Sequence, residues 1–252
     1  MSDEIEKPLF FELKEIDSTN RYLWSLLEDK SLPEGSVVYT DFQTAGRGQA
    51  GNFWESEEGK NLLFSLLVYP DFLPANQQFL ISQIVSLSVK KVLERYIKEV
   101  RVKWPNDIYW NEQKICGILI ENDLMGEWMS RSVIGVGLNV NQEKFHSDAP
   151  NPVSLFQITG KKYKRDELLE DFLHVFFDYY TLLLQERIDE IRTAYVEALF
   201  HGDGYYGYTD RNGTFEAVVY SIEPTGHLIL QLRTGELRRY AFKEVAFDVS
   251  GD

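Results

Sequence analysis

A short glycine-rich segment most constrains what this chain can fold into. Residues 46–51 read GRGQAG, which matches the G-x-G-x-x-G pattern of dinucleotide-binding loops. That pattern works only where the glycines join a strand to the start of a helix, because the free amides there hold a pyrophosphate. Here a β-rich segment at 36–42 comes first, but residues 52–60 lack a helical period and another strand-like run follows at 61–69. We therefore predict strand, glycine loop, strand, and not a dinucleotide-binding turn.

The charge and composition exclude several classes of protein. The chain has 252 residues, 44% of them hydrophobic, and a net charge of −14, so it can build a core but disfavours DNA and other nucleic acids as partners. Its one cysteine, Cys116, allows no internal disulfide and lies in an apolar run typical of a buried strand. The acidic N-terminus lacks the apolar segment of a leader, and the longest apolar run, 62–69, is too short to span a membrane. We predict a cytoplasmic protein that does not associate with membranes.

The hydrophobic pattern predicts alternating helices and strands followed by a change of texture. Helices are expected at 21–28, with Asp17 or Ser18 as the cap, at 75–96, and as a pair within 165–200. Strands are expected at 100–103, 108–110, 114–121 and 128–140. After His201, short strand-like runs with turn signals at 211–213, 224–226 and 234–235 predict a small antiparallel barrel. The predicted domains are residues 1–201 and 202–252.

One further segment, Lys103-Trp104-Pro105-Asn106-Asp107, carries chemistry. Pro105 interrupts strand pairing, so its neighbours can project from the end of a sheet. A lysine suits a phosphate and an aspartate suits Mg²⁺, although a salt-bridged turn is the alternative interpretation. Lys114 and Arg47 add cations in an acidic chain. This profile is typical of an enzyme that handles phosphates and a carboxylate.

Five motifs occur in a fixed order along residues 18–141. They are Ser18-Thr19-Asn20; Gln43-x-Ala45-Gly46-Arg47-Gly48 with Trp54; Lys103 to Asp107; Lys114-x-x-Gly117-Ile118-Leu119; and Gly135-x-Gly137-x-Asn139-x-Asn141. Together they strongly resemble the biotin–protein ligases, or biotin–acetyl-CoA-carboxylase ligases. The resemblance implies an α+β fold, with a mixed or antiparallel sheet flanked by helices, as in class II synthetase-like ligase domains, followed by a small SH3-like β-barrel.

The resemblance also implies roles for individual residues, with the glycine loop closing over biotin and its adenylate. It assigns biotin binding to Ser18, Thr19, Asn20, Gln43, Arg47, Gly48, Gln49 and Lys114. It assigns ATP binding to Arg47, Trp54, Lys103, Asn106, Asp107 and Asn139, with Asp107 serving the metal. Catalysis is assigned to Lys103, Lys114, Arg47 and Asp107, because two anions must be neutralised before they can react.

The implied reaction uses ATP and Mg²⁺ to convert biotin to biotinyl-5′-AMP. Biotin then passes to a lysine of the biotin carboxyl carrier domain of acetyl-CoA carboxylase or a related carboxylase. A lipoate–protein ligase of the same superfamily and a non-catalytic biotin or nucleotide sensor are the alternatives. The Lys103–Asp107 motif disfavours the first alternative, and retention of both Lys103 and Lys114 disfavours the second. The sequence leaves the oligomeric state open, a homodimer included, along with the acceptor carboxylase and the affinities.

Two features differ from the commoner pattern of the family. Gln49 stands where a second loop arginine is usual, which puts its part in holding the adenylate in question. Only 16 residues precede Asp17, too few for the N-terminal winged helix of members that repress transcription. The resemblance is therefore to the enzyme-only form.

Overall fold

The computed structural model describes residues 7–147 and 151–248. The acidic N-terminus, for which no leader is predicted, lies mostly outside these residues. The chain divides into two compact units, residues 1–75 with 113–171 and residues 76–112 with 172–252. This division follows spatial proximity and not chain order, so the domain boundary between residues 201 and 202 stays a prediction.

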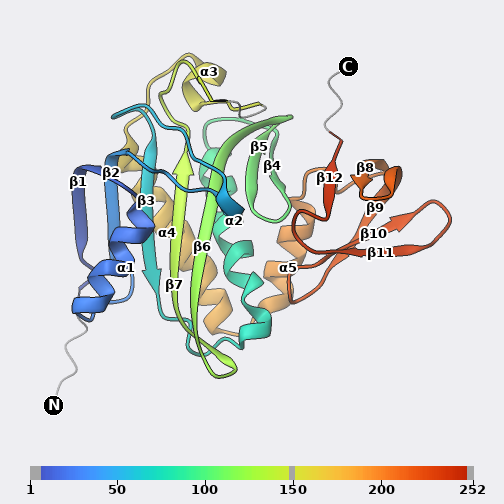
Figure 1. The fold of residues 1–252 in the computed structure, drawn as a ribbon, viewed down its shortest axis with the longest axis horizontal. Coiled ribbons are helices and arrows are strands. Elements are labelled where there is room, and N and C mark those ends of the chain that lie inside the picture. The colour runs from blue at the N-terminus through green and yellow to red at the C-terminus, as the bar shows by residue number, and fades with distance from the viewer. Residues whose placement is uncertain (1–6, 148–150, 249–252) are drawn as a thin grey trace. The chain divides into compact units, whose positions relative to one another are not determined.

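The first unit is built on a mixed sheet. Its strands lie in the order β1-β2-β3-β7-β6; their bounds are Phe10–Ile16 (β1), Val37–Gln43 (β2), Leu62–Val68 (β3), Gln113–Met125 (β6) and Trp128–Leu138 (β7). Strands β1 and β2 are parallel, and the remaining neighbours are antiparallel (Figure 1). The strand–glycine loop–strand prediction is confirmed, since β2 and β3 flank a loop whose only helical part is the 3₁₀ turn Gln49–Gly51. Cys116 is fully buried in β6, as its apolar surroundings indicate.

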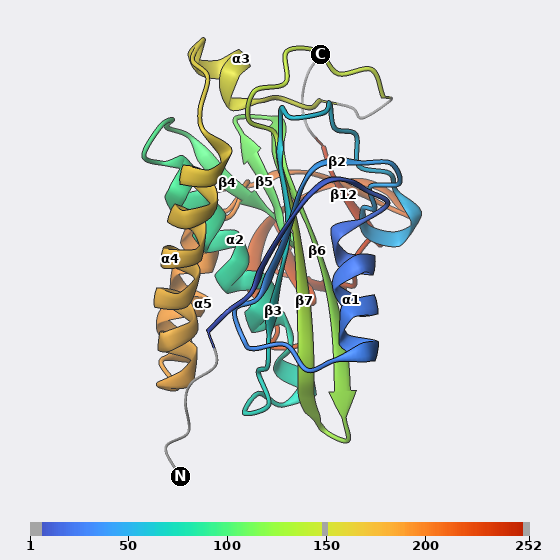
Figure 2. The same cartoon turned by 90° about the vertical axis from the view of Figure 1, so that its left-hand side faces the viewer.

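Helices cover both faces of this sheet. Helix α1 (Thr19–Asp29) packs on β2, β3 and β7, and Figure 2 shows it on one face with the start of α4 (Arg165–Leu184) on the other. All seven residues of β3 are buried, because both sides of the strand are covered. Helix α1 begins two residues before the prediction, with Ser18 at the N-cap, but the Ser18 side chain makes no capping hydrogen bond. The short helix α3 (Leu155–Thr159) and strand β1 were not predicted, because neither shows a clear period.

The second unit contains helices and a short hairpin. The helix expected over 75–96 is a 3₁₀ turn (Ala75–Gln77) followed by α2 (Phe79–Leu93). Strands β4 (Val100–Lys103) and β5 (Asp107–Trp110) pair antiparallel. The predicted helix pair is confirmed as α4 and α5 (Ile188–Glu197), which separate at Glu186, where φ is +57°. Within the described ranges, no helix combines the length and apolar character needed to cross a membrane.

The C-terminal strands of the second unit form an antiparallel sheet in the order β11-β10-β9-β8-β12. Their bounds are Tyr206–Asp210 (β8), Gly213–Ile222 (β9), Leu228–Leu232 (β10), Leu237–Tyr240 (β11) and Val245–Phe247 (β12). The three predicted turns connect β8 through β11, as expected. The described strands nevertheless do not close into the predicted barrel, because β12 has three residues and pairs with β8 and not with β11.

Candidate functional site

One face of the first unit's sheet carries neighbouring glycines on β6 and β7. Gly117 of β6 lies opposite Gly137 of β7, and Gly135 lies two residues before Gly137 on the same face. Larger residues would not fit, because a β-carbon at Gly117 would come within 2.7 Å of the Trp54 ring and one at Gly137 within 2.6 Å. At Gly135 a β-carbon would collide with the Asn20 side chain. The sheet is thus a flat floor on which Asn20 and Trp54 lie.

A buried polar cluster stands beside Gly135 at the start of α1. The Gln43 side-chain oxygen accepts from the backbone amide of Thr19 at 2.8 Å and from its hydroxyl at 3.2 Å. The Ser65 hydroxyl, on β3, lies 2.8 Å from the Thr19 hydroxyl and 2.6 Å from the Asn20 side-chain oxygen, and it can donate to either. These four residues are at most 9% exposed, and Ser18 beside them is 3% exposed. The cluster offers both donors and acceptors in a dry setting.

The glycine loop lies over the same face. It folds back on itself, since Gly48 donates its amide to the Asn52 carbonyl at 2.7 Å and Trp54 to the Gly46 carbonyl at 3.0 Å. Arg47 forms an ion pair with Glu121 at 3.2 Å, and Gln49 donates to the Ile118 carbonyl at 3.5 Å. The loop is therefore held above β6 mainly by partly exposed contacts, which suits a segment that changes conformation around a ligand.

Trp54 and Asn139 continue the site along β7. The indole nitrogen of Trp54 and the side-chain oxygen of Asn139 are both buried and lack hydrogen-bond partners among the described residues. Such atoms are rare without a ligand or water to satisfy them. The Lys114 ammonium lies 5.8 Å from the Trp54 ring. A donor, an acceptor, an aromatic plane and a cation therefore converge at this end of the glycine floor.

The residues of the second predicted group lie in the β4–β5 hairpin of the other unit. Lys103 and Asp107 are directly opposite each other across the two strands, so their side chains share a face. Trp104, Pro105 and the buried Asn106 make the turn, as the proline predicts. The Lys103 ammonium donates to the Tyr109 hydroxyl at 3.2 Å. A cation and a carboxylate therefore stand together, as a Mg²⁺–phosphate ligand requires.

The metal-binding prediction rests on Asp107. No group of three or more histidine, cysteine, aspartate or glutamate side chains that could hold a metal occurs in the described part of the chain. Mg²⁺ in nucleotide sites commonly uses one or two carboxylates together with substrate phosphates and water. The residues fit a Mg²⁺ that is shared with a triphosphate, and do not fit a cation held by protein ligands alone.

Sequence reasoning missed two polar residues of the site. Ser65 is a single hydroxyl within the fully buried strand β3, and Glu121 accepts from Asn20 at 2.9 Å while it pairs with Arg47. The lone serine in an apolar run is a signal that could have revealed the first. Glu121 ends the apolar run of β6, but only the fold shows that it joins the α1 start to the glycine loop.

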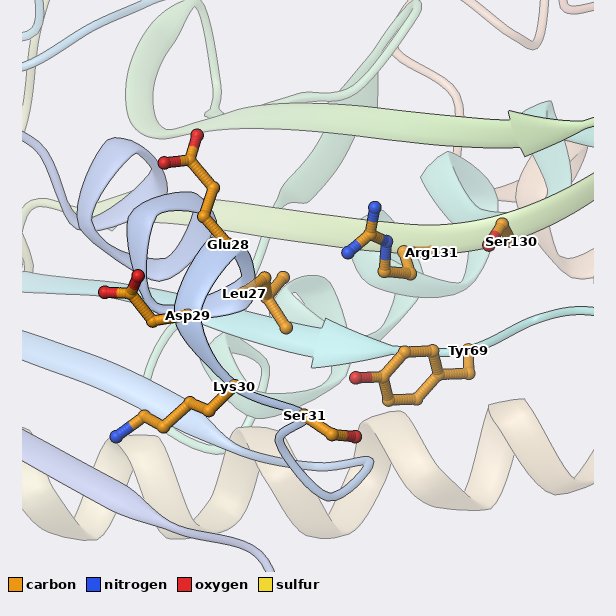
Figure 3. Close-up of a pocket in the computed structure, with 8 residues that line it drawn as sticks. All are labelled: Leu27, Glu28, Asp29, Lys30, Ser31, Tyr69, Ser130 and Arg131. Carbon is orange, nitrogen blue, oxygen red and sulfur yellow. The ribbon is translucent and has the colours of Figure 1, made fainter.

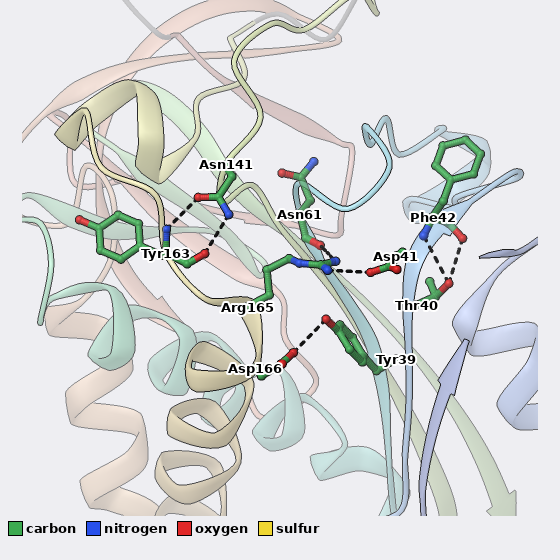
Figure 4. Close-up of polar contacts among 9 residues, drawn as sticks. All are labelled: Tyr39, Thr40, Asp41, Phe42, Asn61, Asn141, Tyr163, Arg165 and Asp166. Atoms are coloured by element: carbon green, nitrogen blue, oxygen red, sulfur yellow. Dashed lines mark hydrogen bonds and ion pairs between the residues drawn. The ribbon is translucent and has the colours of Figure 1, made fainter. Parts of the chain in front are cut away.

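A second polar network joins the start of α4 to β2 and to the residue before β3 (Figure 4). Arg165, the first residue of α4, bonds to Asp41 at 2.6 Å and to the Asn61 carbonyl at 3.2 Å, while Asp166 accepts from the Tyr39 hydroxyl at 3.0 Å. Burial raises the pKa of Tyr39 well above its ordinary value, so the hydroxyl stays a donor. These contacts fix the ends of β2 and β3 between which the glycine loop runs.

Gln142 links this network to the segment that carries Trp54. Its side-chain oxygen accepts from the Asn61 side chain at 2.5 Å and from the Glu57 backbone amide at 3.1 Å. Gln142 is only 1% exposed. The Glu55 carboxylate accepts at 2.8 Å from the amides of both His146 and Ser147. The residues after Trp54 are thereby tied to the chain that follows β7.

An open hollow of about 460 Å³ lies elsewhere in the first unit. Figure 3 shows it beside the C-terminal end of α1, lined by Lys30, Tyr69, Arg131 and neighbouring residues. Arg131 is engaged by Asp123 at 2.6 Å and lies over the Trp24 ring at 5.4 Å. Because α1 begins at the polar cluster and ends here, the hollow belongs to the other end of the helix from the predicted site residues.

Comparison with known proteins gives consistent results. The model of the biotin/lipoate A/B protein ligase family matches residues 12–139. The chain is 31% identical over 222 residues to the bifunctional ligase/repressor BirA of Bacillus subtilis (strain 168), covering 85% of this chain and 67% of that protein. It is 32% identical over 177 residues to biotin–protein ligase 1, chloroplastic, of Arabidopsis thaliana, covering 68% and 48%. A solved structure, the biotin protein ligase from Aquifex aeolicus in complex with biotin and ATP, matches with a TM-score of 0.76 at 25% identity, covering 94% of this chain and 97% of that one.

Proposed function

Because the chain belongs to the biotin/lipoate A/B protein ligase family, we propose that it is an ATP-dependent biotin–protein ligase. It activates biotin with ATP and transfers it to a protein. The observation that carries this proposal is the buried polar cluster of Thr19, Asn20, Gln43 and Ser65 beside the glycine floor. A ureido ring has two N–H donors and one carbonyl acceptor, so it needs such a mixed set in a dry site.

The order of groups along β7 supports an elongated ligand. The polar cluster lies beside Gly135. Trp54 lies against Gly137, with the Lys114 ammonium near its ring. Two residues later comes the Asn139 side-chain oxygen, which has no hydrogen-bond partner among the described residues. With a rise of about 3.3 Å per residue, these positions span roughly 13 Å. That length accommodates a bicyclic ring, a carboxyl group and a nucleotide base in sequence. We assign the ring to the first position, the carboxyl group to the second and the adenine to the third.

In the first step a biotin carboxylate oxygen attacks the α-phosphorus of ATP, and pyrophosphate leaves as the P–O bond breaks. Both reactants are anions, so the reaction needs cations that are already in place. Arg47 and Lys114 serve the carboxyl and α-phosphate oxygens, while Lys103 serves the departing phosphates. Asp107 would hold a Mg²⁺ ion shared with the triphosphate, and that ion would supply neutralisation of phosphate charge. Ordering of the glycine loop keeps water from the mixed anhydride.

In the second step an amine attacks the carbonyl carbon of biotinyl-5′-AMP. An amide bond forms, the anhydride C–O bond breaks, AMP leaves and the amine loses a proton. Lys114 again faces the oxygen on which charge develops. The acceptor is a lysine of a biotin carboxyl carrier domain, from acetyl-CoA carboxylase or a related carboxylase. We assign the protein to the cytoplasm and no role to DNA.

Lipoate is the competing substrate within the family. A lipoyl group has a dithiolane and no ureido ring, so it would offer no hydrogen bonds in exchange for those that Thr19 and Gln43 make with each other. Incubation with ATP, Mg²⁺ and a carrier domain should give ATP-dependent transfer of biotin with release of AMP, and no transfer of lipoate. Preferred transfer of lipoate, or binding of biotin with no adenylate formed, would contradict the proposal.

The two lysines give a sharper test. Removal of either cation should slow adenylate formation by on the order of 10²–10³. When synthetic biotinyl-5′-AMP is supplied, Lys103→Ala should transfer biotin at the parent rate, because that intermediate has already lost pyrophosphate. Lys114→Ala should stay slow, because the same oxygen needs a cation in both steps. Transfer by Lys114→Ala at the parent rate would overturn its assignment.

A further inference from the structure

Residues after α5 run beside the strand that carries Lys103. The amide of Val102 donates to the Ala198 carbonyl at 2.9 Å, and the amide of Phe200 donates to the Val102 carbonyl at 2.9 Å. This short parallel pairing fixes the register of the two segments. It brings His201, the next residue along the chain, close to Lys103. Burial is the main cause that lowers the pKa of His201, and the positive charge of Lys103 is the second.

Two aromatic rings lie close to the Lys103 ammonium, and two further rings pack against them. It lies 4.7 Å from the centre of the Tyr109 ring and 5.7 Å from that of Phe247, a residue of β12. Phe200 packs against Tyr109 at 5.6 Å, and His201 against Phe247 at 6.1 Å. Tyr109, Phe200 and Phe247 are each at most 8% exposed. We call Tyr109, Phe200, His201 and Phe247 the Lys103 cage.

The next two residues of the motif are held by the same unit. The Trp104 indole donates to the Gly226 carbonyl at 2.9 Å, in the turn between β9 and β10. The Tyr195 hydroxyl, on α5, donates to the Pro105 carbonyl at 2.6 Å. Gly226 is itself confined, because its φ is +89° and a β-carbon would come within 2.7 Å of the Phe79 ring. The C-terminal sheet and α5 thus hold the Trp104 side chain and the Pro105 carbonyl within the turn.

We propose that the C-terminal sheet positions Lys103 for ATP, with Phe247 and Tyr109 as positioning residues. A free lysine side chain samples many rotamers, and their loss on binding opposes the capture of phosphate. Ring faces attract an ammonium through the ring quadrupole, so contact with Tyr109 and Phe247 restricts the rotamers that the Lys103 side chain can adopt. The cage therefore orders the Lys103 ammonium before a phosphate binds. This inference rests on the proposed role of Lys103 toward the triphosphate.

Phe247→Leu tests the cage, with Phe215→Leu as the matched control. Phe215 belongs to the same sheet and packs against Tyr208 and Tyr240, and the rings over the Lys103 ammonium are those of Tyr109 and Phe247. In biotin-dependent exchange of pyrophosphate into ATP, Phe247→Leu should raise the KM for ATP by about threefold to thirtyfold and leave the KM for biotin unchanged. Phe247→Tyr, which keeps the ring, should restore the parent value. Transfer from synthetic biotinyl-5′-AMP should be unaffected in all three variants.

Two outcomes would contradict the proposed role of the cage. One is an equal effect of Phe247→Leu and Phe215→Leu, and the other is a KM for biotin that rises with that for ATP. Tyr109→Phe adds a check, because it keeps the ring and removes only the hydroxyl, so its KM for ATP should rise less than that of Phe247→Leu. Lys103→Ala is measured alongside. If Lys103→Ala is impaired and the Phe247→Leu variant is normal, the cage alone is wrong; if Lys103→Ala is normal, the role proposed for the lysine is wrong.

Discussion

The Trp54 indole lies so close to Gly137 that a β-carbon there would come within 2.6 Å of the indole nitrogen. The neighbouring atoms belong to a rigid aromatic ring that also covers Gly117. The clash therefore cannot be relieved by rotation at the end of a flexible side chain. The glycines of β6 and β7 therefore determine where the aromatic plane of the proposed nucleotide site lies.

Gly137→Ala should displace this indole. Overpacking of a tight contact costs about 1–3 kcal/mol, so binding that depends on the indole position should weaken by about tenfold or more. The measurement is the KM for ATP in pyrophosphate exchange, together with the tryptophan emission spectrum, from which the Trp54 part is obtained by difference with Trp54→Phe because the chain has five tryptophans. Gly204→Ala is the control, because a β-carbon there would meet only Tyr206 at an ordinary 3.6 Å. An unchanged KM and spectrum in Gly137→Ala would contradict the proposed use of Trp54.

The glycine floor also shows what sequence could reveal and what it could not. Local backbone preferences predicted the loop between two strands and the turn at Pro105, whereas the mixed sheet was an implication of the family resemblance. The partners of those motifs were not predictable. Glu121 and Ser65 become part of the site only through pairing of distant strands, and no local pattern encodes which side chain lies over which glycine. The missing barrel closure has the same origin, since it depends on how far β12 pairs.

A second prediction concerns the contact of Arg47 with Glu121. Both side chains are partly exposed, so loss of the ion pair should cost less than about 1 kcal/mol of global stability. Glu121→Gln should nevertheless speed hydrogen exchange of the amides of residues 46–51 in the free protein, because it loosens the loop. Addition of biotin and ATP should slow the exchange in both proteins. Exchange that is slow without ligand and unchanged by it would rule out an ordering step.

A third prediction uses the Glu55 carboxylate. Burial raises its pKa, but hydrogen bonds from Ser147 and from the His146 and Ser147 amides outweigh burial, so the pKa lies below its ordinary 4.5. The contribution of these bonds is therefore complete above pH 4.5 and is lost as the pH falls through the lowered value. The amide resonances of His146 and Ser147 should titrate with a midpoint below 4.5.

Glu55→Gln should abolish that titration, while Glu57→Gln should preserve it. Glu57 is the matched control because its side chain is exposed and only its backbone amide bonds to Gln142. A midpoint at or above the ordinary value, or the same curve in Glu55→Gln, would show that the carboxylate does not hold the residues after β7.

The last prediction concerns His201, which stacks between Phe200 and Tyr206 with ring centres 3.9 Å apart in each case. Burial, the largest cause, and the charge of Lys103 together lower its pKa from 6.5 to about 4, against the opposing effect of Asp203 and Asp248. The folded state therefore binds fewer protons than the unfolded state between the ordinary 6.5 and about 4. Stability should be unaffected by this group above 6.5 and should fall as the pH decreases through that window.

His201→Phe isolates this effect, because a phenyl ring can keep both stacks but cannot bind a proton. Since the imidazole is only partly buried, the loss it causes in the parent on going to pH 4 should be on the order of 1 kcal/mol. Chemical unfolding at several pH values should give the variant a shallower decline than the parent. His174→Gln, at an exposed position of α4, controls for removal of a histidine and should retain the parent's slope. Parallel curves for His201→Phe and the parent would mean that the stacked imidazole does not stay neutral as the protein is acidified.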